Sequence, residues 1–237
     1  MQANKQTNKG LVAHWSFEEG KGKTTRDRVT SKEDPISYVF NEAEFALPRE
    51  PQWRNGVGSG ALLFDGYSTW VSREAAGAPV IRDTLTITAW VAPRCYEWGD
   101  EERLSAIVNQ HDRERREGYV LGMYRHGAWS LQIGCGDRWE AVWSKDAVLV
   151  RNRWSFVTAV FDGSRGIMKL FLNGEAVACR PLATGTTIAP SSEDLWIGKN
   201  NRCTVLAGSF ELNMFSGLIG DLKLYDRALD DSEIAGA

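Results

Sequence analysis

The sequence predicts an all-β protein built as a sandwich of two antiparallel sheets. Short stretches of alternating or continuous apolar residues recur along nearly all 237 residues, separated by turn-forming residues. Helical periodicity is almost absent, and no stretch repeats at a fixed period, which disfavours a propeller or a solenoid. Because 43% of the residues are hydrophobic and no Pro-, Gly- or Ser-rich linker divides the chain, we expect one large core.

The clearest strands lie in the middle of the chain. Residues 85–92 (LTITAWVA) alternate Leu85, Ile87, Ala89 and Val91 with polar residues and Trp90, which predicts a half-buried strand. Residues 154–161 (WSFVTAVF) are apolar on both faces, as expected of a central strand.

The clearest hairpin surrounds Asn173 and Gly174. These two residues separate the strand-like runs IMKLFL and EAVACR. Asn-Gly readily adopts the two positive φ angles of a type I′ turn, so the spacing predicts a tight hairpin.

Further strand-like segments precede and follow these, which brings the expected number of strands to about a dozen. In chain order they are LVAHWSF (11–17), ALLFDG (61–66), TWVSR (69–73), LSAIVNQ (104–110), GYVLGMY (118–124), WSLQIG (129–134), WEAVWS (139–144), DLWIG (194–198) and FSGLIGDLKLY (215–225).

The end of the chain, GDLKLYDRALDDSEI (220–234), combines a strand with a helix start. Leu222 and Leu224 alternate with polar neighbours. Asp230 can then serve as N-cap with Glu233 three residues on, a capping box that predicts a short C-terminal helical turn. The run lacks the glycine and glutamate of an EF-hand calcium loop.

Six motifs occur in the order found in laminin-G-like domains of the concanavalin A-like lectin/glucanase jelly-roll class, which the chain resembles from residue 11 to 235. They are LVAHWSFEEGKGKTTRD, GVGSGALLFDGYSTWV, LTITAWV, WSFVTAVFDG, LWIGKN and FSGLIGDLKLYDRALDDSEI. The resemblance implies a two-sheet antiparallel jelly-roll sandwich. We expect a disordered tail at residues 1–10 and a single domain over 11–237.

The segment EDPISYVFNEAEF (33–45), followed by PQWRNGV, resembles more closely the accessory module of bacterial family 32 glycoside hydrolases, which cleave fructans and sucrose. This resemblance implies a non-catalytic, carbohydrate-associated module beside a catalytic domain of the same polypeptide. The resemblance implies a glycan as partner, with fructans as the candidate class. A structural or protein-interaction domain that packs on a catalytic neighbour, without a sugar site, is the alternative.

An autonomous glycan hydrolase is a weaker alternative. The Glu-x-Asp-x-Glu pattern of catalytic jelly rolls, which sets carboxylates on one face of a strand, does not occur in the chain. The Trp-Met-Asn-Asp-Pro-Asn type of signature of family 32 enzymes is missing too, as are G-x-S-x-G and H-E-x-x-H. A catalytic pair supplied by loops leaves no such pattern, so the alternative stays open.

Aromatic residues are the most informative candidates for function, because sugar rings stack on exposed aromatic faces while nearby polar groups bind the hydroxyls. Four of the ten tryptophans are expected to pack in the core: Trp15, Trp90, Trp154 and Trp196. The candidates for carbohydrate binding are Tyr96, Trp98, His111, Asp112, Trp139 and Trp143. The spacing of four places the last two on one face of a strand, although covering a sheet or a neighbouring domain would explain them as well.

The resemblance also implies a structural calcium ion where the loop after the first strand meets the last strand. Its ligands would include Glu18, Asp27 and Asp221, because calcium prefers carboxylate and carbonyl oxygens. The alternative is that Asp221 faces solvent or caps a turn.

Charge and hydropathy exclude several classes of protein. The net charge of −3 argues against nucleic-acid binding, and no apolar run is long enough to cross a membrane. The four cysteines form no C-x-x-C pair, which argues against a zinc knuckle. The start of the chain has no apolar signal segment, so we expect a cytoplasmic protein if Met1 is the natural start, or an extracellular or cell-surface one if the chain is an excised domain.

Overall fold

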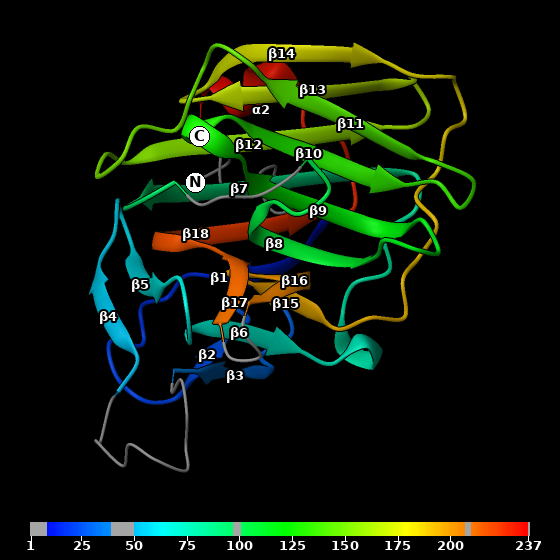
Figure 1. The fold of residues 1–237 in the computed structure, drawn as a ribbon. Coiled ribbons are helices and arrows are strands. Elements are labelled where there is room, and N and C mark those ends of the chain that lie inside the picture. The colour runs from blue at the N-terminus through cyan, green and yellow to red at the C-terminus, as the bar shows by residue number, and fades with distance from the viewer. Residues whose placement is uncertain (1–8, 39–49, 97–100, 207–209, 237) are drawn as a thin grey trace.

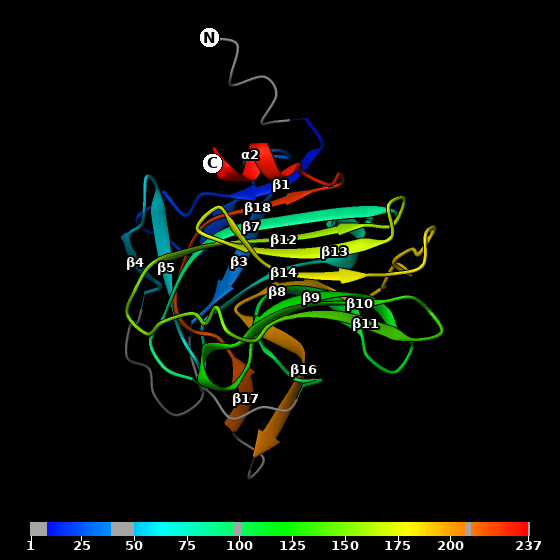
Figure 2. The same ribbon diagram turned by 90° about the horizontal axis from the view of Figure 1, so that it is seen from above.

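Two antiparallel sheets pack face to face, as the sequence predicted (Figures 1 and 2). The computed structural model describes residues 9–38, 50–96, 101–206 and 210–236. Figure 2, seen from above, separates the layer of β7, β12, β13 and β14 from the layer of β8 to β11. The jelly-roll sandwich implied by the family resemblance is therefore confirmed.

The first sheet has eight strands in the order β14-β13-β12-β7-β18-β5-β4, with β1 paired to β18. Their bounds are β1 (Leu11–Trp15), β4 (Gln52–Asn55), β5 (Gly60–Asp65), β7 (Thr84–Pro93), β12 (Ser155–Asp162), β13 (Ile167–Leu172), β14 (Glu175–Pro181) and β18 (Ser216–Tyr225). The pairing of first and last strands brings the two ends of the domain together.

The second sheet has ten strands, eight of them in the order β11-β10-β9-β8-β15-β6-β3-β2, and β17 connects β16 to β8. Their bounds are β2 (Thr24–Arg26), β3 (Glu33–Ser37), β6 (Trp70–Arg73), β8 (Ser105–Asp112), β9 (Glu117–Met123), β10 (Trp129–Gly134), β11 (Trp139–Ser144), β15 (Leu195–Ile197), β16 (Lys199–Leu206) and β17 (Phe210–Met214). Two 3-10 turns, η1 (Ala75–Gly77) and η2 (Arg125–Gly127), lie between strands. The outer face of this sheet is the one seen in Figure 1.

The core lies between the two sheets. The alternating apolar residues of β7 (Leu85, Ile87, Ala89 and Val91) are all fully buried there, as predicted. Trp15 is also fully buried, whereas the other three tryptophans assigned to packing, Trp90, Trp154 and Trp196, are only partly buried.

The opposite face of β7 is also covered, which the prediction of a half-buried strand did not anticipate. Thr86 is fully buried, donates a 2.8 Å hydrogen bond from Oγ1 to the carbonyl of Arg227 and accepts one from the amide of Leu229. The helix α2 (Asp231–Ala235) follows, and its Ile234 packs on Val160 and Phe171. The C-terminal segment therefore closes the outer face of the first sheet.

The two local predictions about turns and caps are confirmed. Asn173 and Gly174 have φ angles of 52° and 85° between β13 and β14, as a type I′ hairpin requires. Asp230 caps α2 in a reciprocal capping box with Glu233.

The sequence did not predict five of the strands, namely β2, β3, β4, β16 and β17. The first three lie at or near sheet edges, and the last two lie off the main strand order of the second sheet. β2 and β4 have three and four residues, and β3 contains Pro35, which cannot donate to a sheet ladder. No helix in the described ranges is long and apolar enough to cross a membrane. Residues 1–8, most of the predicted disordered tail, lie outside the described residues.

Candidate functional site

A β-bulge in β8 directs His111 to the outer face of the second sheet. Ala106 pairs with Gly122 and Val108 with Leu121, so Ile107 is an extra residue on β8. Both Ile107 and Val108 face the core, and the alternation beyond them is shifted by one residue. Without the bulge, His111 would point between the sheets.

The hydrogen bonds around His111 fix its tautomer. The amide of Asn109 donates through Nδ2 to the carbonyls of Trp196 (3.2 Å) and Lys199 (2.6 Å), so its Oδ1 is the atom that faces His111. That oxygen lies 3.0 Å from Nδ1 of His111 and also accepts from the backbone amide of Asn201 at 2.8 Å. Nδ1 must therefore carry the proton, and Nε2 is left as an acceptor.

The acceptor Nε2 of His111 is buried and has no hydrogen-bond partner within the described part of the chain. The residue as a whole is 1% exposed. Burial, followed by the positive charge of Arg113, lowers the pKa of His111 to about 4. The ring is therefore neutral at physiological pH, and an unsatisfied buried acceptor of this kind calls for an explanation.

Trp139 packs beside His111 at the start of β11. The two rings meet edge to face with centroids 5.8 Å apart. The guanidinium of Arg113 lies over the indole at 4.3 Å from its centroid, and the indole Nε1 donates to the carbonyl of Arg113 at 3.1 Å. Arg113 thus covers one face of Trp139. Nη1 of Arg113 in turn donates a hydrogen bond to Oε1 of Gln132 at 2.8 Å.

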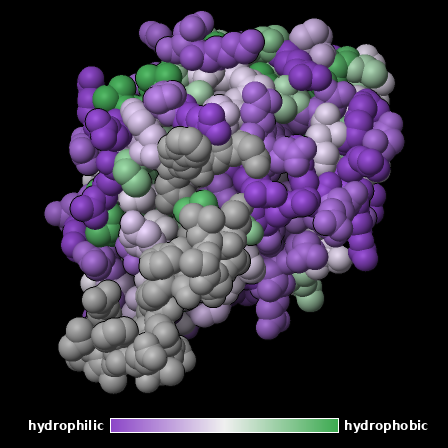
Figure 3. Space-filling model, in the orientation of Figure 1, coloured by the Kyte–Doolittle hydropathy of each residue, from purple (hydrophilic) through white to green (hydrophobic). Residues whose placement is uncertain are grey.

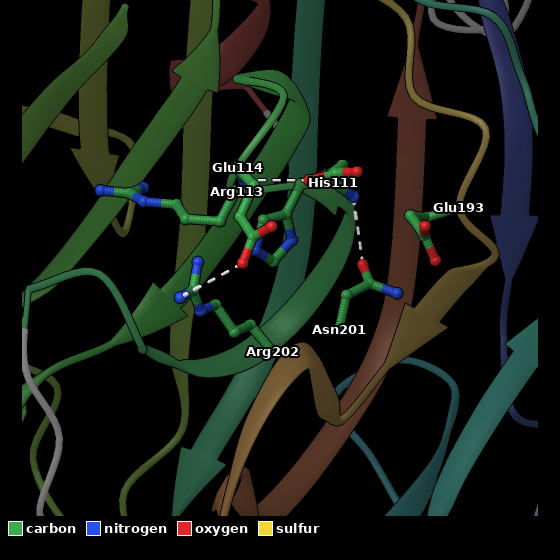
Figure 4. Close-up of a pocket in the computed structure, with 7 residues that line it drawn as sticks. His111, Arg113, Glu114, Glu193, Asn201 and Arg202 are labelled. Atoms are coloured by element: carbon green, nitrogen blue, oxygen red, sulfur yellow. Dashed lines mark hydrogen bonds and ion pairs between the residues drawn. The ribbon is translucent and has the colours of Figure 1, made fainter.

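Next to these rings the surface forms a polar hollow of about 200 Å³ (Figure 4). It is lined by His111, Asp112, Arg113, Glu114, Glu193, Asn201 and Arg202. Glu114 and Arg202 form a weak ion pair at 3.8 Å, with side chains 84% and 38% exposed. In Figure 4 the Glu114 carboxylate is drawn across the edge of the imidazole, and Arg202 lies to its lower left. Figure 3, viewed from the same side as Figure 1, shows that the surrounding surface is predominantly hydrophilic.

Of the six predicted sugar-binding residues, the structure brings three together. His111 and Trp139 are in contact, and Asp112 lines the hollow beside them. The Asp112 carboxylate also stabilises the β8–β9 turn, because its Oδ1 accepts hydrogen bonds from the amides of Glu114 (2.9 Å) and Arg115 (3.0 Å).

The other three predicted residues do not join this group. Trp143 lies at the far end of β11, where it meets Tyr124 edge to face at 5.5 Å and packs on a separate outer cluster. Tyr96 lies at that same far end and donates its hydroxyl to the carbonyl of Leu149 at 2.9 Å. Trp98 lies outside the described residues.

Sequence reasoning missed the residues that complete the hollow. Arg113 and Glu114 lie in the charged run DRERREG (112–118), whose mixed signs are typical of a solvated loop. Glu193, Asn201 and Arg202 come from segments about β15 and β16, roughly 80 to 90 positions further along the chain. No local pattern links such distant segments, because only the sheet pairing brings them together.

Beside the first strand, Asp27 does not behave as an open metal ligand. Its buried carboxylate accepts from the amides of His14 (2.8 Å) and Val29 (3.0 Å), from Thr30 Oγ1 (2.5 Å) and from Arg73 Nη1 (3.0 Å). Burial opposes ionisation of Asp27, but these bonds outweigh it and lower the pKa. All four acceptor sites are therefore used by the protein itself.

Glu18 and Asp221 line a common hollow of about 400 Å³, but each is already paired with a cation. Glu18 binds Arg28. Asp221 accepts from His14 Nε2 at 2.7 Å and from Lys223 Nζ at 2.6 Å; burial raises its pKa, and these two bonds lower it further than burial raises it. Among the described residues, no group of three or more His, Cys, Asp or Glu side chains is placed to hold a metal ion. The three carboxylates therefore do not fit a calcium ion in this arrangement.

The calcium ion implied by the family resemblance can be tested directly. A specific site at a calcium concentration a hundredfold above its Kd would stabilise the fold by about 2.7 kcal/mol. Because arginine and lysine side chains already neutralise the three carboxylates, we expect the urea midpoint to be the same in calcium and in chelator. A calcium-dependent rise that disappears in Asp221→Asn would contradict this and assign the ion to the first-strand site.

A comparison with protein families matches residues 65–235 to the family described as "Concanavalin A-like lectin/glucanases superfamily". The match covers more than half of the chain.

Among curated proteins, the chain is similar to pentraxin-related protein PTX3. It is 33% identical to the Bos taurus protein over 161 residues, which are 67% of this chain and 40% of that protein. It is 34% identical to the Mus musculus protein over 90 residues, which are 38% of this chain and 24% of that protein. The chain thus spans well under half the length of these relatives.

Among solved structures, the fold is similar to domain 4 of AbnA, a family 43 extracellular arabinanase from Geobacillus stearothermophilus, in complex with arabinotriose. The TM-score is 0.67 at 16% identity, and the match covers 95% of this chain and 97% of that domain. The binding domain of botulinum neurotoxin serotype G matches with a TM-score of 0.62 at 14% identity, covering 95% of this chain and 50% of that one. At these identities the likeness is one of fold.

Proposed function

Because the chain belongs to the concanavalin A-like lectin/glucanase superfamily, we propose that it is a non-catalytic module that binds a glycan in the hollow beside His111 and Trp139. The observation that carries this proposal is the buried, unpartnered Nε2 of His111 next to a half-buried tryptophan. A ligand hydroxyl would satisfy the buried acceptor, and the exposed part of the indole would contact an apolar sugar face.

The hollow also offers several groups for further hydroxyls. Carboxylates of Glu114 and Glu193 can accept hydrogen bonds, and the guanidinium of Arg202 can donate them. Sugar recognition combines such polar groups with an aromatic surface, and this is the combination that the second sheet places on its outer face.

Acid–base catalysis by His111 is not part of the proposal. A general acid or base works best with a pKa near the operating pH. The pKa of His111 is lowered to about 4 by burial and by the charge of Arg113, so the ring neither carries a proton to donate at neutral pH nor accepts one readily.

We propose neutral furanose polymers as the first ligands to test, with the module joined to a catalytic domain. The segment at residues 33–45 resembles accessory modules of fructan-cleaving enzymes, and the structurally similar arabinanase domain was solved with arabinotriose. Fructans and arabinans are both chains of five-membered sugar rings. Such a module would act outside the cell or at its surface, where these polymers are degraded.

The test is isothermal titration of the chain with arabinotriose and with short inulin and levan oligosaccharides. Trp139→Ala should weaken binding by about tenfold or more, since aromatic contacts of this kind contribute roughly 1 kcal/mol or more. Trp53→Ala is the matched control, because Trp53 is also half-buried but lies on β4 of the other sheet, and it should bind like the parent.

Three results would overturn the proposal. Binding that is equally weakened by both substitutions would place the ligand elsewhere or reflect general destabilisation. A flat titration with every glycan would favour a domain that only packs on a neighbour, and release of reducing sugar from any of them would show that the chain is itself an enzyme.

A further inference from the structure

We infer that the ligand of this hollow is a neutral glycan, one hydroxyl of which donates a hydrogen bond to Nε2 of His111. The inference rests on the proposed function and narrows it, because it excludes acidic sugars such as sialosides and uronates from the same site.

The first step is the direction of the missing hydrogen bond. Asn109 is oriented by its two bonds to the carbonyls of Trp196 and Lys199, so its Oδ1 must receive the proton of His111 Nδ1. Nε2 therefore has a lone pair and no hydrogen. A hydroxyl group can donate to it, whereas an ionised carboxylate or sulfate has only acceptor atoms and cannot.

The second step is the charge around the hollow. Its lining includes three carboxylates, on Asp112, Glu114 and Glu193, and two guanidiniums, on Arg113 and Arg202. Arg113 is engaged by Gln132 and by the ring of Trp139, and Arg202 by Glu114. Arg115 pairs with Asp112 at 3.5 Å and Glu102 with Arg113 at 3.8 Å, so four carboxylates face three guanidiniums when these neighbours are counted. An acidic sugar would add a further negative charge to this excess, whereas a neutral polyol can donate to the carboxylates and accept from the guanidiniums.

The third step is access to the buried atom. The pair of Glu114 and Arg202 lies at the hollow with an N–O distance of 3.8 Å and with Glu114 84% exposed. Exposed pairs of this length contribute little to stability, so the two side chains can turn outward at small cost. When a ligand binds, Glu114 and Arg202 would separate from each other and form hydrogen bonds with ligand hydroxyls instead.

The experiment compares neutral with acidic glycans on the whole chain. The neutral probes are arabinotriose and inulin oligosaccharides, and the acidic probes are 3′-sialyllactose and oligogalacturonate. We expect the neutral set to bind at least about tenfold more tightly, and His111→Leu to lose about tenfold for neutral ligands while His111→Gln, which keeps a polar acceptor, loses less. His126→Asn, at an exposed histidine in η2, is the control and should be unchanged.

Nitrogen-15 NMR of the imidazoles supplies a readout that does not depend on affinity. His111 should show a protonated Nδ1 and an unprotonated Nε2, and the Nε2 resonance should move when a neutral glycan binds. Binding of acidic glycans alone, or a protonated Nε2, would overturn this inference and leave the glycan-binding proposal standing. Absence of binding by both sets would overturn the proposed function itself.

Discussion

Arg73→Met is expected to destabilise the fold by about 3–5 kcal/mol, the usual cost of removing one member of a buried ion pair. The guanidinium bridges two buried carboxylates. It donates to Asp27 at 3.0 Å and to Asp34 through Nε at 3.0 Å and Nη2 at 2.6 Å, with all three side chains at most 5% exposed. It also lies over the ring of Trp15, 4.6 Å from the centroid.

Methionine fills most of the volume of arginine but leaves two carboxylates buried without their cation. Asp34 keeps the indole of Trp15 as a donor at 2.7 Å, and Asp27 keeps two backbone amides and the Thr30 hydroxyl, but all of these donors are neutral. Urea unfolding followed by tryptophan fluorescence would measure the loss as a lower midpoint.

The matched control is Arg28→Met, at an arginine whose partner Glu18 is also a carboxylate but whose pair is about half exposed. That substitution should cost less than about 1 kcal/mol. Arg73 is one of the groups that lower the pKa of Asp27. In Arg73→Met the pKa of this buried carboxyl should rise, so that it takes up a proton more readily in the native state, and the deficit of Arg73→Met should shrink as the pH falls from 7 towards 4. Equal effects of the two substitutions, or a deficit independent of pH, would contradict the role assigned to Arg73.

The sequence was sufficient for the parts of the fold that depend on local chemistry. The alternation of Leu85 and Ile87, the Asn173-Gly174 turn and the capping box at Asp230 each involve neighbours in sequence, and each is confirmed. The coverage of Thr86 by the C-terminal segment was not predictable in the same way, because it depends on where a segment about 140 residues away returns.

The candidate site was predictable only in part for the same reason. His111 and Trp139 were selected as a polar residue and an aromatic residue at strand ends, and the sheet does bring them together. The bulge at Ile107 decides which way His111 points, and nothing in the run SAIVNQHD signals an extra residue. No local pattern indicated the cations that pair with the three carboxylates, since Arg73, for example, lies 46 positions from Asp27.

The stability of the folded chain should fall by roughly 3 kcal/mol between pH 6.5 and pH 4 through His111 alone. Burial, together with the charge of Arg113, lowers the pKa of this ring from 6.5 to about 4 in the native state. Asp112 raises the pKa of His111, whereas Arg202 lowers it, as Arg113 does. Glu114 and Glu193 line the same hollow. Between pH 6.5 and pH 4, His111 binds a proton in the unfolded chain but not in the native chain. The contribution of His111 to the free energy of unfolding is therefore fully present above about pH 6.5 and is lost as the pH falls. Each pKa unit of difference corresponds to about 1.4 kcal/mol.

Replacing the titrating ring isolates this contribution from the carboxylates that also titrate near pH 4. The free energy of unfolding of His111→Leu, from urea titrations at closely spaced pH values, should be less dependent on pH between 6.5 and 4 than that of the parent chain. The exposed His126 in η2 provides the comparison, and His126→Asn should reproduce the parent curve. If His111→Leu follows the parent curve as well, the imidazole is not held neutral by its surroundings. Glycan affinity should also fall as the pH drops towards 4, because protonation of His111 at Nε2 removes the acceptor that the ligand hydroxyl requires.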